Sequence, residues 1–105
     1  MTEFDDHTFL DKHENLQKVT ALLKAVANEK RLKIMCVLSG GEKSVGELEK
    51  VIDLSQSALS QHLARLRRDR VVTTRRDAQT IYYSILDNNV VELVKHACVM
   101  VNTPK

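Results

Sequence analysis

Two helix-start signals stand close together in the middle of the chain and leave little room between the helices that they begin. The segment Ser44-Val45-Gly46-Glu47 has the capping-box pattern, in which the serine hydroxyl and the glutamate carboxylate each bind a backbone amide at a helix start. This helix is expected to end near Ile52. The next segment, Asp53-Leu54-Ser55, forms a tight turn whose serine caps a second helix over 56–69. Two short helices joined in this way predict a helix-turn-helix over 44–69.

The pattern of apolar residues changes after this second helix. Two runs rich in β-branched and aromatic residues, 71–76 and 80–85, flank the short polar stretch 77–79. Such an arrangement indicates a β-hairpin, here over 71–85. A hairpin that directly follows a helix-turn-helix predicts the winged form of that motif, with the hairpin as the wing.

Helical periodicity dominates the rest of the chain. Apolar residues recur at helix spacing from about Asp11 to Val26, and again after Asn28, which is placed to cap a helix that ends at Gly40-Gly41. A last periodic segment spans 88–102. The predicted fold is therefore mainly α with a small β-hairpin, a winged helix-turn-helix in the order α-α-α-α-β-β-α.

Length and composition fit a single domain over 1–105. The chain is 43% apolar and 29% charged, which is typical of a helix-rich globular protein. Residues 1–11 are acid-rich and are expected to form a flexible tail. The sequence shows no signal-peptide pattern, and no apolar run approaches the roughly 18 residues of a membrane span. We expect a cytoplasmic protein with no membrane partner.

Positive charge is concentrated although the net charge is only +2. Six of the seven arginines lie within the twelve-residue stretch 65–76, where Asp69 is the only acid before the hairpin turn. A solvated charged face usually mixes both signs, whereas a cluster of arginines is typical of a surface that binds phosphates. The distribution of charge therefore predicts a nucleic acid as a partner, and the predicted helix-turn-helix specifies double-stranded DNA.

The helix predicted over 56–69 has a face suited to the major groove. Leu59, Leu63 and Leu66 share one face and are expected to point into the core. The opposite face carries small and amide side chains without acids, which allow close approach and can bind base edges or phosphates. The residues expected to contact DNA, including those of the wing, are Ser55, Gln56, Ser57, Ser60, Gln61, Arg65, Arg68, Arg75, Arg76 and Gln79.

Four segments within residues 20–86 resemble the ArsR/SmtB family of winged-helix repressors. They are LLKAVANEKRL (22–32), SVGEL (44–48), LSQSALSQHL (54–63) and RRDAQTIYY (75–83). The resemblance implies a homodimer that is released from its operator when an inducer binds or modifies it. At Arg70 many family members have glycine, because this position often needs a positive φ.

The resemblance also places the dimer interface on the terminal helices, which carry more apolar surface than a small core covers. In a two-fold dimer, the two DNA-reading helices meet an inverted-repeat operator in half-sites roughly 34–36 Å apart. The residues expected at the interface are Leu16, Val19, Leu23, Val90, Val94, Ala97 and Val101.

Two cysteines raise the question of what such a regulator senses. Alone, each is typical of a small buried hydrophobe. The chain resembles the persulfide-sensing branch of the family (BigR/SqrR/HlyU-like regulators), which implies that Cys36 and Cys98 are redox-sensing residues joined through a disulfide or polysulfide bridge by reactive sulfur species. Cys98 stands about four residues before the position that this branch implies, an axial shift of roughly 6 Å. A direct bridge needs Cα atoms about 4.4–6.8 Å apart, so the sequence leaves the contact open.

The sequence predicts no metal site and no cofactor, and a metal sensor is kept only as the weakest alternative. The segment 44–50 lacks the cysteines of a thiolate site. Asp87 matches the first ligand of a zinc site between the last helices, but Asn89, Met100 and Thr103 fill the later positions. Histidines and a glutamate near the start of the chain (His7, His13 and Glu14) fall in or near the expected tail, and His62 is expected to pack among the core leucines.

Three other classes of protein compete with a thiol-switched repressor. An enzyme is not expected, because the sequence holds no glycine-rich phosphate loop, nucleophile elbow or convergent acid–base set. A regulator without thiol sensing, resembling the rhizobial NolR proteins, shares the motifs at 55–63 and 75–83. An anti-repressor that displaces another DNA-binding protein would use the same fold.

Overall fold

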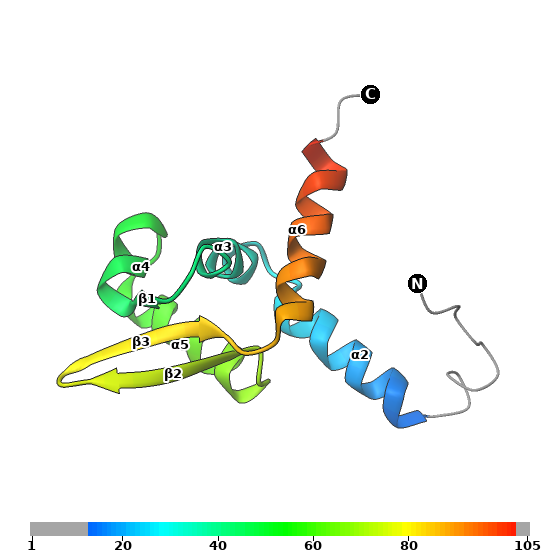
Figure 1. Cartoon of the computed structure of the whole chain (residues 1–105), viewed down its shortest axis with the longest axis horizontal. Helices are drawn as coiled ribbons and strands as arrows, with labels where there is room; N and C mark the ends of the chain where they lie inside the picture. Colours follow the sequence, from blue (N-terminus) through cyan, green and yellow to red (C-terminus); the bar gives the residue numbers. More distant parts are fainter. Residues whose placement is uncertain (1–12, 103–105) are drawn as a thin grey trace.

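The computed structural model describes residues 13–102, which form five helices and a small antiparallel sheet (Figure 1). This order confirms the predicted four helices, hairpin and final helix, and the sheet gains one short strand that was not predicted. The expected tail at 1–11 lies outside the described residues. The elements are α2 (His13–Val26), α3 (Glu29–Leu38), β1 (Lys43–Ser44), α4 (Val45–Val51), α5 (Gln56–Arg68), β2 (Val72–Asp77), β3 (Thr80–Ile85) and α6 (Asn88–Asn102).

Side-chain caps set the starts of the three central helices. The Asn28 carboxamide accepts hydrogen bonds from two backbone amides of α3 at 2.9 and 3.1 Å. At α4, the Ser44 hydroxyl accepts from the Glu47 amide at 3.1 Å, while the Glu47 carboxylate accepts from the Ser44 amide at 2.9 Å. The Ser55 hydroxyl accepts from the Ala58 amide at 3.2 Å and begins α5. All three predicted caps are confirmed, and they fix the two helices of the motif around a short turn.

The sheet has the strand order β1-β3-β2, with all neighbours antiparallel. Asp77 pairs with Thr80, so the hairpin turn is only two residues long, and Ala78 adopts a φ of 58° there. The strand β1 was missed because a two-residue strand carries no alternating pattern. It pairs Lys43 with Tyr83 and thereby ties the start of α4 to the wing.

The fold buries one side of every central element. The largest fully buried side chains come from α3, α4, α5 and the start of the wing: Ile34, Met35, Leu48, Leu59, Leu63, Leu66, Val71 and Val72. From α6, Val90 and Val94 join this core and are each only 3% exposed. The protomer's own core thus already covers these two valines, which were expected at a dimer interface, and leaves them little surface to offer a partner.

The two terminal helices extend beyond this core. Figure 1 shows α2 and the far end of α6 projecting from the body formed by α3, α4, α5 and the sheet. Of α2, only Ala25 and Val26 are buried. Both projecting segments expose large apolar side chains, namely Leu16, Val19, Leu23, Leu93, Val99, Met100 and Val101.

The end of α5 is closed by a left-handed residue. Arg70 has a φ of 60°, its amide donates to the Arg67 carbonyl at 3.0 Å, and the Val71 amide donates to the Leu66 carbonyl at 2.9 Å. This is the pair of bonds of a Schellman motif, in which glycine is the usual left-handed residue. The expected need for a positive φ at this position is confirmed.

We predict that Arg70→Gly raises the free energy of unfolding by about 1 kcal/mol, because it relieves the contact between Cβ and the backbone in the left-handed region. Urea unfolding monitored by circular dichroism measures this change. Arg67→Gly is the matched control, since it removes an arginine at an exposed helical position and should lower the free energy of unfolding by about 1 kcal/mol. Equal destabilisation by both variants would contradict the assignment of strain to Arg70.

Candidate DNA-binding surface and cysteine pair

The outer face of α5 presents short polar side chains to solvent. Ser57, Ser60 and Gln61 are exposed, as are Ser55 and Gln56 at the start of the helix. The three leucines of the opposite face are at most 1% exposed, so their packing determines which side of α5 points outward. The first turn of α5 contains no acid. A helix N-terminus without acids, lined by hydroxyl and amide groups, is suited to bind base edges and phosphates.

The arginines of α5 differ in how much charge they leave unpaired. Arg65 is half-buried, and its Nε donates to Asp69 Oδ2 at 3.0 Å. Arg68 lies 3.9 Å from the same carboxylate, but its side chain is 71% exposed. Both line a hollow of about 470 Å³ together with Arg31 of α3, a residue that the sequence did not indicate for this surface. Only the folded chain shows that Arg31 lies beside α5, because no local pattern links the two helices.

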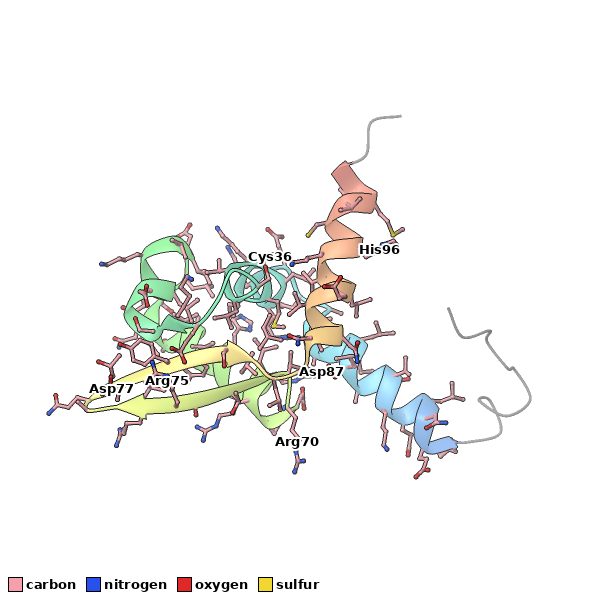
Figure 2. All side chains as sticks on the ribbon, viewed as in Figure 1. Cys36, Arg70, Arg75, Asp77, Asp87 and His96 are labelled. Atoms are coloured by element: carbon pink, nitrogen blue, oxygen red, sulfur yellow. The ribbon has the colours of Figure 1, made fainter. Side chains whose placement is uncertain are left out.

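The two arginines of the wing point to opposite faces of the sheet. Side chains alternate along a strand, so Arg76 shares the face of buried Val72, whereas Arg75 lies on the other face. Arg75 donates two hydrogen bonds to the Glu42 carboxylate, at 2.7 and 2.8 Å, and its guanidinium lies 4.5 Å from the centre of the Tyr82 ring. Figure 2 shows Arg75 along the wing, with Asp77 nearer its tip.

This ion pair alters the titration of both partners. The hydrogen bonds from Arg75 lower the pKa of Glu42, and those to Glu42 raise the pKa of Arg75. The charge of Arg75 is thus balanced within the protein, while Arg76 and Gln79 are exposed at the outer part of the wing. Arg75 and Arg76 both stay predicted DNA contacts, but a contact by Arg75 would require it to leave Glu42.

Cys36 of α3 and Cys98 of α6 lie side by side. Their Sγ atoms are 3.8 Å apart, and both side chains are exposed. They line an apolar cavity of about 280 Å³ whose other walls are Leu32, Val94, Ala97 and Val101. The one-turn offset that the sequence left open is thus accommodated by the way α6 packs against α3. Figure 2 labels Cys36 on α3, beside α6.

Burial is the main cause of a raised pKa at Cys36, followed by the hydrogen bond and the charge interaction with Cys98. A raised pKa keeps the thiol protonated at neutral pH, and thiolates are the reactive form. The chemistry of this pair therefore depends on the proximity of the two sulfurs more than on a preformed thiolate.

The other candidate ligands are dispersed. Within residues 13–102, no three histidine, cysteine or acidic side chains group into a metal site. Asp87 instead begins α6, since its carboxylate accepts from the Asn89 amide at 2.9 Å. His62 is half-buried at the edge of the core, not fully packed within it as expected. His13 and Glu14 are exposed at the start of α2, and His7 and Thr103 lie outside the described residues.

Comparison with known proteins agrees with this geometry. The family model described as "Bacterial regulatory protein, arsR family" matches residues 28–74. The transcriptional activator HlyU of Vibrio cholerae is 51% identical over 85 residues, which are 81% of this chain and 79% of that protein. The chain belongs to the ArsR family. It is therefore a transcriptional regulator and not an enzyme.

Solved structures of similar proteins have the same fold. Reduced HlyU from V. cholerae matches with a TM-score of 0.79 and 46% identity, over 90% of this chain and 98% of that one. NolR from Sinorhizobium fredii matches with a TM-score of 0.78 and 41% identity over the whole of both chains. A homodimeric winged helix-turn-helix fragment of Mb0332 from Mycobacterium bovis has a TM-score of 0.76 and 27% identity, over 95% of this chain and 88% of that one.

Among the helices of residues 13–102, none combines the length and the hydropathy that a membrane span requires.

The separation of the two sulfurs leads to a prediction about chemistry that is independent of DNA. Mild oxidation with diamide should produce an intramolecular disulfide, because the Sγ atoms are 3.8 Å apart and need to approach by less than 2 Å to reach the S–S length of about 2.05 Å. Mass spectrometry of the non-reduced protein should give the mass of a single chain minus two hydrogen atoms. After digestion, the peptides that contain Cys36 and Cys98 should be joined. Cys98→Ser is the control and should retain the unmodified mass. Products linked only between chains would contradict the observed proximity.

Proposed function

We propose that this chain is a homodimeric repressor that binds double-stranded DNA at an inverted-repeat operator and is released when Cys36 and Cys98 become linked through sulfur. The exposed, acid-free face of α5 is the observation that supports DNA binding. The distance of 3.8 Å between the two Sγ atoms is the observation that supports a thiol switch.

In this proposal, the N-terminal half of α5 enters the major groove. Ser55, Gln56, Ser57, Ser60 and Gln61 then face base edges and adjacent phosphates, with the backbone amides of the first turn directed at the sugar–phosphate chain. The partly paired Arg65 and Arg68 and the wing residues Arg76 and Gln79 supply contacts to flanking phosphates. These groups form one surface because α5 and the wing pack on the same core.

A second copy of the chain would cover the projecting apolar helices. Leu23 is 49% exposed on α2, and Met100 and Val101 are 67% and 85% exposed at the end of α6. Exposed apolar groups in this number favour association. The homodimeric Mb0332 fragment has the same fold. We therefore retain Leu16, Val19, Leu23, Ala97 and Val101 as interface residues and omit Val90 and Val94.

The switch step is a thiol oxidation by a sulfane-sulfur donor. The Cys36 thiolate takes the terminal sulfur of a polysulfide, which leaves one sulfur shorter. The Cys98 thiolate then attacks the Cys36 Sγ, forms the disulfide and expels hydrosulfide. The two cysteines lose two electrons and two protons, and the transferred sulfur is reduced to hydrogen sulfide. A bridge that retains one sulfur spans a longer gap. It forms when a second polysulfide first converts Cys98 to its persulfide, and the terminal sulfur of the Cys36 persulfide then attacks the Cys98 Sγ and expels hydrosulfide.

Either bridge would alter the packing of α6 on α3. The shorter bridge needs the two Sγ atoms to approach by almost 2 Å from their present separation. The same helix α6 contributes Val90 and Val94 to the core and exposes Val101 for the partner. Displacement of α6 would therefore change how two protomers meet and how far apart their α5 helices lie. The solved structure of the relative HlyU is specified as that of the reduced protein, which is consistent with a redox-dependent structure in this family.

A regulator without thiol sensing is the second candidate. The raised pKa of Cys36 and the likeness to NolR favour it. In that case, DNA binding is the same whether the cysteines are reduced or bridged, which the next experiment decides.

We predict that sodium tetrasulfide weakens DNA binding by the wild-type protein at least tenfold, which corresponds to about 1.4 kcal/mol, and that dithiothreitol restores it. Gel-shift titration with a duplex selected from a random library measures the effect. Cys36→Ser and Cys98→Ser should bind that duplex as the reduced wild type does and should not respond. A Cys36→Ser protein that responds like the wild type would refute the switch while leaving DNA binding intact.

The two wing arginines provide a matched test of the docking. Arg76→Ala should reduce the slope of log Kd against log salt concentration by about 0.9 for each protomer, because one phosphate contact is lost. Arg75→Ala should leave this slope unchanged, because Glu42 already balances the charge of Arg75. Fluorescence anisotropy over a series of potassium chloride concentrations measures both. The opposite pattern would show that Arg75 leaves Glu42 to bind DNA.

A further inference from the structure

Arg31 belongs to α3, but its guanidinium links three helices. Its Nε donates to the Ala25 carbonyl at 2.6 Å, and one Nη donates to the Lys24 carbonyl at 3.4 Å. These carbonyls lie in the last turn of α2, where the helix itself supplies no donors. The other Nη lies 3.4 Å from Nδ1 of His62 on α5. One side chain thus connects the end of α2 to the helix proposed to read DNA.

The contact with His62 fixes the state of the imidazole. Arginine has five N–H donors and no acceptor, so Nδ1 of His62 must accept and the proton of the ring must lie on Nε2. Only a neutral imidazole can do this. Burial, and then the charge of Arg31, lower the pKa of His62, in agreement with the geometry.

The charged groups around this contact come from two helices. Arg31 faces His62 from α3, and Arg65 and Arg68 line the same hollow from α5, with Asp69 paired to both of these arginines. The contact with α2 is made through backbone carbonyls. Protonation of His62 would place a further cation among three arginines and remove the acceptor of the Arg31 hydrogen bond.

We propose that Arg31 is a positioning residue that, through neutral His62, holds α5 at a fixed orientation relative to α2. This proposal rests on the proposed function, in which α2 contributes to the dimer interface and α5 enters the major groove. A two-fold dimer binds both half-sites only when its two α5 helices have the correct separation and tilt. Arg31 acts on DNA binding through this orientation, without touching a phosphate.

The competing role for Arg31 is a direct phosphate contact, because the hollow that it lines is rich in arginine. The two roles differ in salt dependence. Loss of a phosphate contact lowers the slope of log Kd against log salt concentration by about 0.9 and weakens all duplexes alike. Loss of orientation leaves the slope unchanged and weakens only a duplex that engages both half-sites.

The experiment compares Arg31→Lys with Lys33→Met, which removes an exposed cation from the same helix. Lysine keeps the charge but cannot form the fork that reaches two carbonyls and His62. Arg31→Lys should raise Kd about tenfold for a duplex selected by the wild type, the factor expected for one hydrogen bond to a charged group. Its Kd for a scrambled duplex and its salt slope should stay within error of the wild type, whereas Lys33→Met should change the Kd for the selected and the scrambled duplex by the same factor. Equal weakening on both duplexes would overturn the positioning role.

A second measurement tests the link without DNA. Since the folded pKa of His62 lies below its ordinary value near 6.5, the stability that depends on its neutral form is present above that value and is lost as the pH falls through the folded pKa. Between pH 7.5 and 5, the urea midpoint should therefore fall more for the wild type than for His62→Gln, whose residue 62 does not titrate. Identical pH profiles for the two proteins would refute the link between Arg31 and His62. Failure of the wild type to select any duplex would refute the proposed function but not this link.

Discussion

The packing of three leucines on α5 is the constraint on which the other features depend. Leu59, Leu63 and Leu66 are buried in the core, so the short polar side chains on the other side of α5 must face solvent. The same core holds Val72 at the start of the wing, which places Arg76 on the face that continues toward α5. An acidic side chain in place of one of these leucines, or a rotation of α5 about its axis, would disrupt the proposed DNA-binding surface even though none of the residues on that surface had changed.

The helix α6 connects this core to the rest of the molecule. Val90 and Val94 pack in the core, Cys98 meets Cys36 one turn later, and Val101 is exposed beyond it. The helix α6 thus carries core residues, one of the two cysteines and an exposed apolar surface. A change at the cysteines can therefore shift the packing of the core and the position of the exposed surface. Arg31 provides a separate connection between the end of α2 and α5. Both connections lie between the projecting helices and the proposed DNA surface.

Local signals in the sequence predicted most of the fold, and long-range contacts account for the rest. The caps at Ser44 and Ser55 and the left-handed residue Arg70 depend on neighbouring residues, so sequence reasoning found them. The bond between Glu42 and Arg75 joins residues 33 positions apart and exists because β1 pairs with β3. Periodicity identifies Val90 and Val94 as part of an apolar stripe, but it does not show whether the protomer's core or a partner covers that stripe. The distance between the cysteines required the packing angle of α6 on α3.

The acid-free face of α5 is the central claim, and selection from a random duplex library tests it most directly. The reduced wild-type protein should enrich an inverted repeat whose half-sites lie about one helical turn apart. Gln61→Glu, which places one carboxylate on the exposed face of α5 and leaves the buried leucines untouched, should enrich no common sequence. Enrichment of the same repeat by both proteins, or of none by the wild type, would contradict the account.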